Sequence, residues 1–274
     1  PKRRYAMAEA KMQETPEYTP GTFCWVELAT TDGEAAKKFY TEFFGWTFTD
    51  SPIGPGEVYT MLKLDGKDVG ALFKMPQEMR SQGVPPNWLS YVLVTNVDES
   101  AQKAKDAGAT LMKEPFDVMD VGRMAVVQDP TGAVFALWQA GTHKGASITN
   151  VPNSFCWNEL GTPDTDKAGE FYTTLFGWEK NVQQMGPMTY TSFINGDRPA
   201  GGMYKPTPEM GDIPPHWLVY FAVDDTDAKL QKANELGGKT LTPAMDIPDT
   251  GRFAIIQDPQ GAAFGIIKLT TPPS

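Results

Sequence analysis

The sequence predicts an α+β protein made of two tandem copies of one domain, each built from two β-α-β-β-β modules. The main observation is an internal repeat, which is sought first because it decides the architecture. The stretch FCWVEL at 23–28 returns as FCWNEL at 155–160, and FYTEFFGW at 39–46 returns as FYTTLFGW at 171–178. Both recurrences lie 132 residues further along the chain, as a single repeated unit requires.

The end of the unit repeats as well, and this recurrence divides the chain. A GR pair followed by QDPxG occupies 122–132 and returns at 251–261, which is 129 residues later, so the second copy is three residues shorter. A chain of 274 residues has room for two domains of ordinary size. We expect a polar N-terminal tail, a first domain, a linker and a second domain, with the bounds 1–20, 21–140, 141–153 and 154–270.

Local patterns predict the first module. Residues 23–30 alternate as a strand does, and Asp32 is a suitable N-cap for a helix that Gly45 would end. The apolar residues at 36, 39, 40 and 43 fall on one face of that helix. Three further strands are expected at 46–49, 57–64 and 68–73.

The second module repeats this order after a loop rich in Pro and Gly at 74–87. A strand at 88–95 precedes a helix that we expect Asp98 to cap. Three strands are predicted at 109–113, 123–128 and 133–139. The second domain follows the same plan, with helices expected after Asp164 and from Asp227 onward.

Composition limits the partners and the location. The net charge of −10 argues against nucleic acid or an anionic membrane as a partner, and no apolar run reaches the length of a membrane span. Cys24 and Cys156 are the only cysteines, at equivalent places in the repeat, which excludes a disulfide framework and favours a reducing compartment. Residues 1–20 lack the apolar core of a secretory signal. We therefore expect a cytoplasmic protein, either a monomer with pseudo-twofold symmetry or a homodimer.

Four β-α-β-β-β modules, a Phe-Tyr pair in the first helix of each copy and an Asp-Pro-x-Gly turn before the last strand resemble the vicinal oxygen chelate superfamily. That superfamily contains glyoxalase I, the fosfomycin and bleomycin resistance proteins and the extradiol dioxygenases. The resemblance covers nearly all of 20–269 and is greatest to a tandem glyoxalase-like subgroup with a mycobacterial member. It implies that each domain forms a curved sheet around a cavity.

The resemblance also implies where a metal would be bound. Members with metal chemistry carry a His on the first strand, a His on the strand after the mid-domain loop, and a Glu on the last strand. The matching positions here hold side chains without a metal-binding lone pair: Trp25, Leu89, Ala136, Trp157, Leu218 and Gly265. We therefore expect no metal and no other cofactor in either cavity.

The chain has two histidines, and both are ambiguous. His143 lies in the linker, where a solvated side chain is the ordinary interpretation. His216 lies two residues before one of the matched positions, so strand alternation could direct it to the same side as a ligand position. The ordinary interpretation of His216 is a residue that packs in a loop.

Strand alternation sorts the residues that would line each cavity. Phe23 and Phe155 are expected to face the cavities, together with a larger set of apolar and aromatic residues. The expected ligand-binding residues are Trp25, Tyr91, Ala136, Trp138, Trp157, Tyr220 and Gly265. Such a composition, apolar walls with a few polar groups, is typical of sites for small organic molecules.

Glu27 and Glu159 are the most informative residues, because a carboxylate among apolar side chains needs hydrogen bonds, a cation or a proton. Two interpretations stay open. Arg123 and Arg252 recur with the glutamates, so each Glu could form a structural ion pair. Alternatively each Glu orients or deprotonates a ligand, as a candidate catalytic residue.

These observations support three hypotheses for function. The first is a glyoxalase- or bleomycin-resistance-like protein that binds a small apolar or aromatic molecule in metal-free cavities. The second is a glyoxalase-like lyase or isomerase that uses Glu27 or Glu159 as general base. The third is a scaffold without catalysis whose cavities are filled by side chains.

Overall fold

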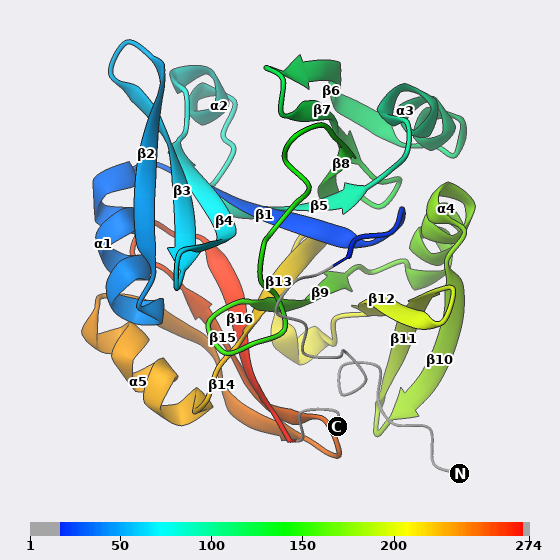
Figure 1. Cartoon of the computed structure of the whole chain (residues 1–274). Coiled ribbons are helices and arrows are strands. Elements are labelled where there is room, and N and C mark those ends of the chain that lie inside the picture. The colour runs from blue at the N-terminus through cyan, green and yellow to red at the C-terminus, as the bar shows by residue number, and fades with distance from the viewer. Residues whose placement is uncertain (1–16, 271–274) are drawn as a thin grey trace.

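The computed structural model describes residues 17–270, which form two curled eight-stranded sheets (Figure 1). The first sheet contains β1 (Phe23–Thr30), β2 (Thr47–Gly54), β3 (Glu57–Leu64), β4 (Lys67–Lys74), β5 (Asn87–Leu93), β6 (Thr110–Val118), β7 (Gly122–Gln128) and β8 (Val134–Ala140). The second contains β9 (Phe155–Gly161), β10 (Glu179–Met185), β11 (Met188–Asn195), β12 (Arg198–Tyr204), β13 (His216–Ala222), β14 (Lys239–Ile247), β15 (Gly251–Gln257) and β16 (Ala263–Leu269). The expected tail, 1–20, lies outside the described residues up to residue 16.

The strand order confirms the predicted fold class. In the first sheet it is β2-β3-β4-β1-β5-β8-β7-β6, and the second sheet repeats this order from β9 to β16. Each module places its first strand parallel to its last, β1 beside β4 and β5 beside β8. The two modules of a sheet meet where β1 pairs antiparallel with β5. The α+β architecture of two tandem domains, each with two β-α-β-β-β modules, is therefore present.

The helices are α1 (Gly33–Phe44), α2 (Gln77–Ser81), α3 (Val97–Asp106), α4 (Thr165–Phe176), α5 (Thr226–Glu235) and a 3-10 turn, η2 (Pro208–Met210). Asp32 caps α1 by accepting from the Ala35 amide, and Gly45 ends it in the left-handed conformation, as the sequence predicts. The expected cap of α3 is wrong by two residues. Asn96 caps that helix, because its side chain accepts from the Glu99 amide, and Asp98 lies in the first turn.

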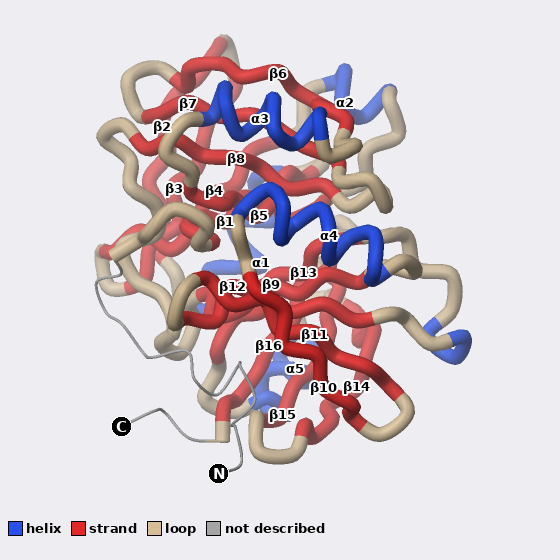
Figure 2. Tube along the Cα trace, turned by 90° about the vertical axis from the view of Figure 1, so that its right-hand side faces the viewer, coloured by secondary structure: helices blue, strands red, loops and turns tan. Residues whose placement is uncertain are grey.

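The first helix of each domain packs against the other domain. Tyr40 of α1 donates to Asp258 of the second domain over 2.7 Å, and Tyr172 of α4 donates to Asp129 of the first domain over 2.7 Å. Figures 1 and 2 accordingly show α1 beside α5 and α4 beside α3. These reciprocal contacts join the two domains through a shared aromatic core. No described helix is long and apolar enough to cross a membrane.

The segment between the sheets, 141–154, packs against the first domain. β1 and β4 pair only from Glu27 onward, so their earlier residues leave backbone groups open. The linker occupies this gap, where the Ala146 amide donates to the Cys24 carbonyl over 2.8 Å and the Ser147 amide donates to the Asp68 carbonyl over 2.7 Å. Figure 1 shows this stretch as the green loop that leaves β8.

Candidate functional site

A β-bulge in β1 decides which side chains reach the inner face of the sheet. Trp25 lies opposite Tyr91 and Phe23 opposite Val92, so one residue of β1 is unmatched and the alternation is reversed before Trp25. Phe23 therefore packs on the helix side, 5.0 Å from the ring of Trp217, and its expected place in the cavity is wrong. The same bulge recurs in β9 and moves Phe155 to the helix side as well.

In the first domain, the carboxylate of Glu27 accepts two tyrosine hydrogen bonds. Tyr59 donates to its Oε2 over 2.6 Å, and Tyr91 donates to its Oε1 over 2.9 Å. The indole of Trp25 donates to the Tyr59 hydroxyl over 3.4 Å. Glu27 is partly buried, and its two hydrogen-bond partners come from the strands β3 and β5.

The second domain builds the same arrangement around Glu159, which is 9% exposed. Tyr190 donates to its Oε2 over 2.8 Å, and Tyr220 donates to its Oε1 over 3.1 Å. Trp157 donates to the Tyr190 hydroxyl over 3.0 Å. We call each set of Glu, two Tyr and Trp a Glu–Tyr site: Trp25, Glu27, Tyr59 and Tyr91 in the first domain, and Trp157, Glu159, Tyr190 and Tyr220 in the second.

The remaining predicted residues lie next to these sites. Ala136 is the β8 neighbour of Tyr91, and Trp138 packs edge-on against the Tyr91 ring at 6.2 Å. Gly265 is the neighbour of Tyr220 in the second sheet. A Cβ at residue 265 would collide with the Tyr220 ring, so this tyrosine lies flat over the glycine.

The sequence did not predict that three further residues lie at the Glu–Tyr sites. Tyr59 and Tyr190 were assigned only to strands, although the pair Tyr-Thr recurs in both copies 131 residues apart and was a usable signal. His143 is the third, and its expected solvation is wrong. Its ring lies edge-on to Trp25 at 4.4 Å, and its Nε2 is buried without a hydrogen-bond partner.

His216 lies on the same side of the second sheet as Glu159. The register pairs His216 with Gly161, two residues after Glu159 on β9. Its Nδ1 bonds to the Pro214 carbonyl over 2.8 Å, so Nδ1 carries the proton and Nε2 is the acceptor. Burial lowers the pKa of both His143 and His216, which keeps them neutral near neutral pH.

Burial is the main influence on the pKa values of the two carboxylates. Burial raises the pKa of Glu27 and of Glu159, and the two tyrosine hydrogen bonds to each carboxylate oppose that rise. The pKa of Tyr59 and Tyr190 is raised well above its usual value by burial and then by the adjacent carboxylate. The tyrosines are therefore donors and not bases near neutral pH.

The two arginines bond to aspartates and not to the glutamates, so of the two interpretations of each Glu the structural ion pair is wrong. Arg123 makes two bonds to Asp98, of 2.8 and 2.9 Å, and one of 3.0 Å to Asp117. Arg252 forms the same set with Asp227 and Asp246 in the second domain. The physical reason is the position of two helix starts. Because α3 begins at Val97 and α5 at Thr226, Asp98 and Asp227 lie in their first turns, next to the arginines.

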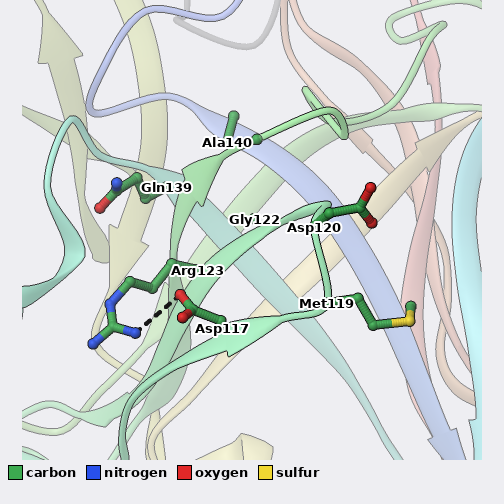
Figure 3. A pocket seen from close by; sticks show the side chains of 8 residues that line it. Asp117, Met119, Asp120, Gly122, Arg123, Gln139 and Ala140 are labelled. Atoms are coloured by element: carbon green, nitrogen blue, oxygen red, sulfur yellow. Dashed lines mark hydrogen bonds and ion pairs between the residues drawn. The ribbon is translucent and has the colours of Figure 1, made fainter.

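A shallow hollow of about 220 Å³ lies beside Arg123 (Figure 3). It is lined by Asp117, Met119, Asp120, Gly122, Arg123, Gln139, Ala140 and Gly141. Figure 3 shows the guanidinium of Arg123 turned toward Asp117. Arg123 is already paired with Asp98 and Asp117, and the Oε1 of Gln139 accepts from the Val97 amide.

The repeated modules, the curled sheets and the duplicated inner-face carboxylates define a protein of the vicinal oxygen chelate fold with tandem domains. The Glyoxalase/Bleomycin resistance protein/Dioxygenase superfamily model matches 22–137 and again 142–266, so the chain belongs to that superfamily.

Relatives over most of the chain have two kinds of name. The "Putative glyoxylase CFP32" of Mycobacterium bovis is 43% identical and covers 94% of this chain and 98% of its own. The "Anthracycline biosynthesis protein DnrV" of Streptomyces peucetius is 36% identical and covers 92% of this chain and 94% of its own.

Solved structures are similar in fold. A Mn(II)-bound glyoxalase from Novosphingobium aromaticivorans has a TM-score of 0.64 at 15% identity, over 91% of this chain and 82% of that one. The 2,3-dioxygenase LapB from Pseudomonas sp. KL28 has a TM-score of 0.62 at 12% identity, over 94% and 96% of the two chains. At these identities the comparison shows the fold alone.

The fold family implies a divalent metal, and the residues here do not fit one. The positions that the resemblance assigns to ligands hold Trp, Leu and Ala in the first domain and Trp, Leu and Gly in the second. Within 17–270 there is no group of three or more His, Cys, Asp and Glu residues that could hold a metal ion. The oxygens of Glu27 and Glu159 already accept from tyrosines.

Proposed function

We propose that this protein binds a small, largely apolar or aromatic organic molecule at each Glu–Tyr site, without metal. The observation that carries the proposal is the repeated carboxylate, hydrogen-bonded to two tyrosines, on the inner face of both sheets. A carboxylate in such surroundings is costly to bury, which favours a role in orienting a polar group of a ligand.

The walls around the carboxylates support an apolar ligand. In the first domain Leu89 of β5 lies opposite Glu27, and Met124 of β7 and Trp138 of β8 contact Tyr91, which donates to that carboxylate. In the second domain Trp157, Leu218, Tyr220 and Ile267 form a cluster separate from the helix-packed cores. Apolar walls contribute affinity through burial, while the few polar groups select orientation.

The relatives support two versions of this function. DnrV is named for anthracycline biosynthesis, and anthracyclines are polycyclic aromatic compounds, which suits a protein that holds an aromatic molecule. CFP32 is named as a glyoxylase, which favours a lyase or isomerase as the second candidate. In that case Glu27 or Glu159 acts as general base, because burial raises its pKa toward the working pH.

A filled scaffold is the remaining alternative. Tyr190 and Tyr220 lie across glycines of the second sheet, and His143 covers Trp25 in the first, so side chains occupy part of each inner face. A scaffold would retain no small molecule, whereas a binding protein would.

The test is native mass spectrometry of the protein purified from its own host. We expect a retained small molecule in the wild-type protein and its loss in a Glu27→Gln, Glu159→Gln double variant that is still folded. A molecule recovered unchanged after incubation supports binding, and one converted to product supports the lyase. Elemental analysis of protein purified without chelators checks the metal: near-stoichiometric zinc, nickel, manganese or iron would refute metal-free sites.

A further inference from the structure

The carboxylates of the Glu–Tyr sites have no cationic partner among the described residues. Their hydrogen bonds come only from neutral tyrosine hydroxyls. The lysines and arginines of the described ion pairs are bound to other acids, as Lys37 is to Asp50, Lys63 to Asp68 and Arg123 to Asp98. The ionised form of either carboxylate therefore has no compensating cation among the described residues.

Hydrogen bonding at these carboxylates is largely satisfied, but their charge is not. Each oxygen of Glu27 and of Glu159 already accepts one tyrosine bond, so a neutral ligand would add a bond and leave the charge uncompensated. An anionic ligand would be repelled by the carboxylate and by the net charge of −10. A cation satisfies both demands, because it neutralises the charge and forms charge-assisted hydrogen bonds with the free lone pairs.

Aromatic rings surround the carboxylates and suit the same kind of ligand. In the first domain the ring of Trp25 adjoins that of His143 at 4.4 Å, and Tyr91 adjoins Trp138 at 6.2 Å. In the second domain Tyr220 adjoins Phe253 at 6.4 Å. The faces of Trp and Tyr attract cations, with about 0.5–2 kcal/mol for each contact depending on desolvation.

We propose that both Glu–Tyr sites select organic cations, that is, a protonated or quaternary amine carried on an apolar or aromatic skeleton. This inference rests on the proposed function and narrows its ligand class. The ammonium group lies against the carboxylate of Glu27 or Glu159, and the skeleton lies along the apolar walls. The two tyrosine bonds hold each carboxylate in place before the ligand arrives.

The test compares three probes that share one skeleton and differ in charge. They are 1-naphthylmethylamine, which is cationic near neutral pH, 1-naphthalenemethanol, which is neutral, and 1-naphthoic acid, which is anionic. Isothermal titration calorimetry of the full chain measures each affinity. We expect the amine to bind about tenfold more tightly than the alcohol, and the acid to bind most weakly.

Variants assign the preference to the glutamates. Glu27→Gln and Glu159→Gln should each reduce the number of amine-selective sites by one, and the double variant should bind amine and alcohol equally well. Asp98→Asn and Asp227→Asn remove the same charge from the outer surface and should leave the preference intact. If a Gln variant does not fold, wild-type titrations at about 0.05 and about 0.5 M salt replace it, since only amine binding should weaken through screening.

Each outcome separates this inference from the function on which it rests. Equal binding of amine and alcohol by the wild-type protein overturns cation selectivity and leaves the proposed function standing. An amine preference that survives in the double variant overturns the assignment to Glu27 and Glu159. Failure of all three probes to bind overturns both the inference and the proposed function.

Discussion

The two Glu–Tyr sites agree in their centre and differ in their surroundings. Glu27 and Glu159 each accept from one tyrosine of the third strand of the domain and one of the fifth. In each site a tryptophan two residues before the glutamate donates to the first tyrosine. Four side chains thus have the same geometry in both copies.

The surroundings differ in size, polarity and depth. Trp138 and Met124 of the first domain correspond to Ile267 and Phe253 of the second, and Asn87 corresponds to His216. The linker adds the ring of His143 to the first site. Under the proposed function, a constant centre with variable walls means that the two sites would share a polar recognition group and accept different skeletons.

The largest expected effect comes from breaking the contacts that join the domains. The Oδ1 of Asp129 accepts from the amides of three residues of its turn, and Oδ2 accepts from Tyr172. We expect Asp129→Ala and Asp258→Ala each to lower the free energy of unfolding by about 3 kcal/mol, because buried donors lose their acceptor. Chemical denaturation measures the loss.

Milder variants show how much of this loss belongs to the domain interface. Tyr172→Phe and Tyr40→Phe remove only the contact between domains and should cost about 1 kcal/mol each. The exposed Asp246→Ala serves as the control. Equal stability of Asp129→Ala and wild type would contradict the assignment of this turn to the interface.

The sequence predicted the fold well because each element occurs twice, so the pattern of one copy could be compared with that of the other. It failed where a single residue changed the local geometry. The bulge before Trp25 reversed the side of Phe23, and alternation alone cannot reveal a bulge. Asn96 and Asp98 are both acceptable caps, and only the observed bond to the Glu99 amide distinguishes them.

The candidate site was predicted in part. Glu27, Trp25 and Tyr91 share one face because of strand register, which the sequence supplies. Tyr59 reaches the same carboxylate from β3, and that contact depends on how the sheet curls. His143 comes from the linker, whose path carries no periodicity. The arginine partners depended on the helix start, and the cytoplasmic location stays a prediction.

A smaller effect is expected from the glycine that lies under one tyrosine. A Cβ at residue 202 would collide with the hydroxyl of Tyr190, whereas the matching residue of the first domain is Ala71. Gly202→Ala should therefore displace Tyr190, break its bond with Trp157 and cost about 1–3 kcal/mol through overpacking.

The reciprocal change provides the control for that prediction. Ala71→Gly introduces no collision and should cost only about 0.5–1 kcal/mol, through the greater freedom of the unfolded chain. Denaturation curves report both variants, and the emission of Trp157 reports the displacement of Tyr190 in Gly202→Ala. If Gly202→Ala is as stable as the wild type, the close approach of Tyr190 to the sheet does not distinguish the two sites.

The smallest effect concerns the pH dependence of stability, to which both glutamates should contribute. Burial raises the pKa of Glu159 in the folded protein above its unfolded value, so the folded state binds a proton more readily. The contribution of Glu159 is therefore most favourable below the unfolded pKa and is lost as pH rises through the folded pKa. The Glu159→Gln variant has no ionisable group at this position and does not lose stability in this way. Its free energy of unfolding relative to wild type should therefore increase from acidic to neutral pH. Each pKa unit of elevation corresponds to about 1.4 kcal/mol.

Glu27→Gln should show the same trend, because burial raises the pKa of Glu27 as well. Urea denaturation at several pH values, with the exposed Asp246→Asn as control, measures both slopes. A relative stability of Glu159→Gln that does not change with pH would show that the carboxylate is ionised at no cost. A cation outside the described residues would then have to compensate it, and the selectivity for cationic ligands would lose its physical basis.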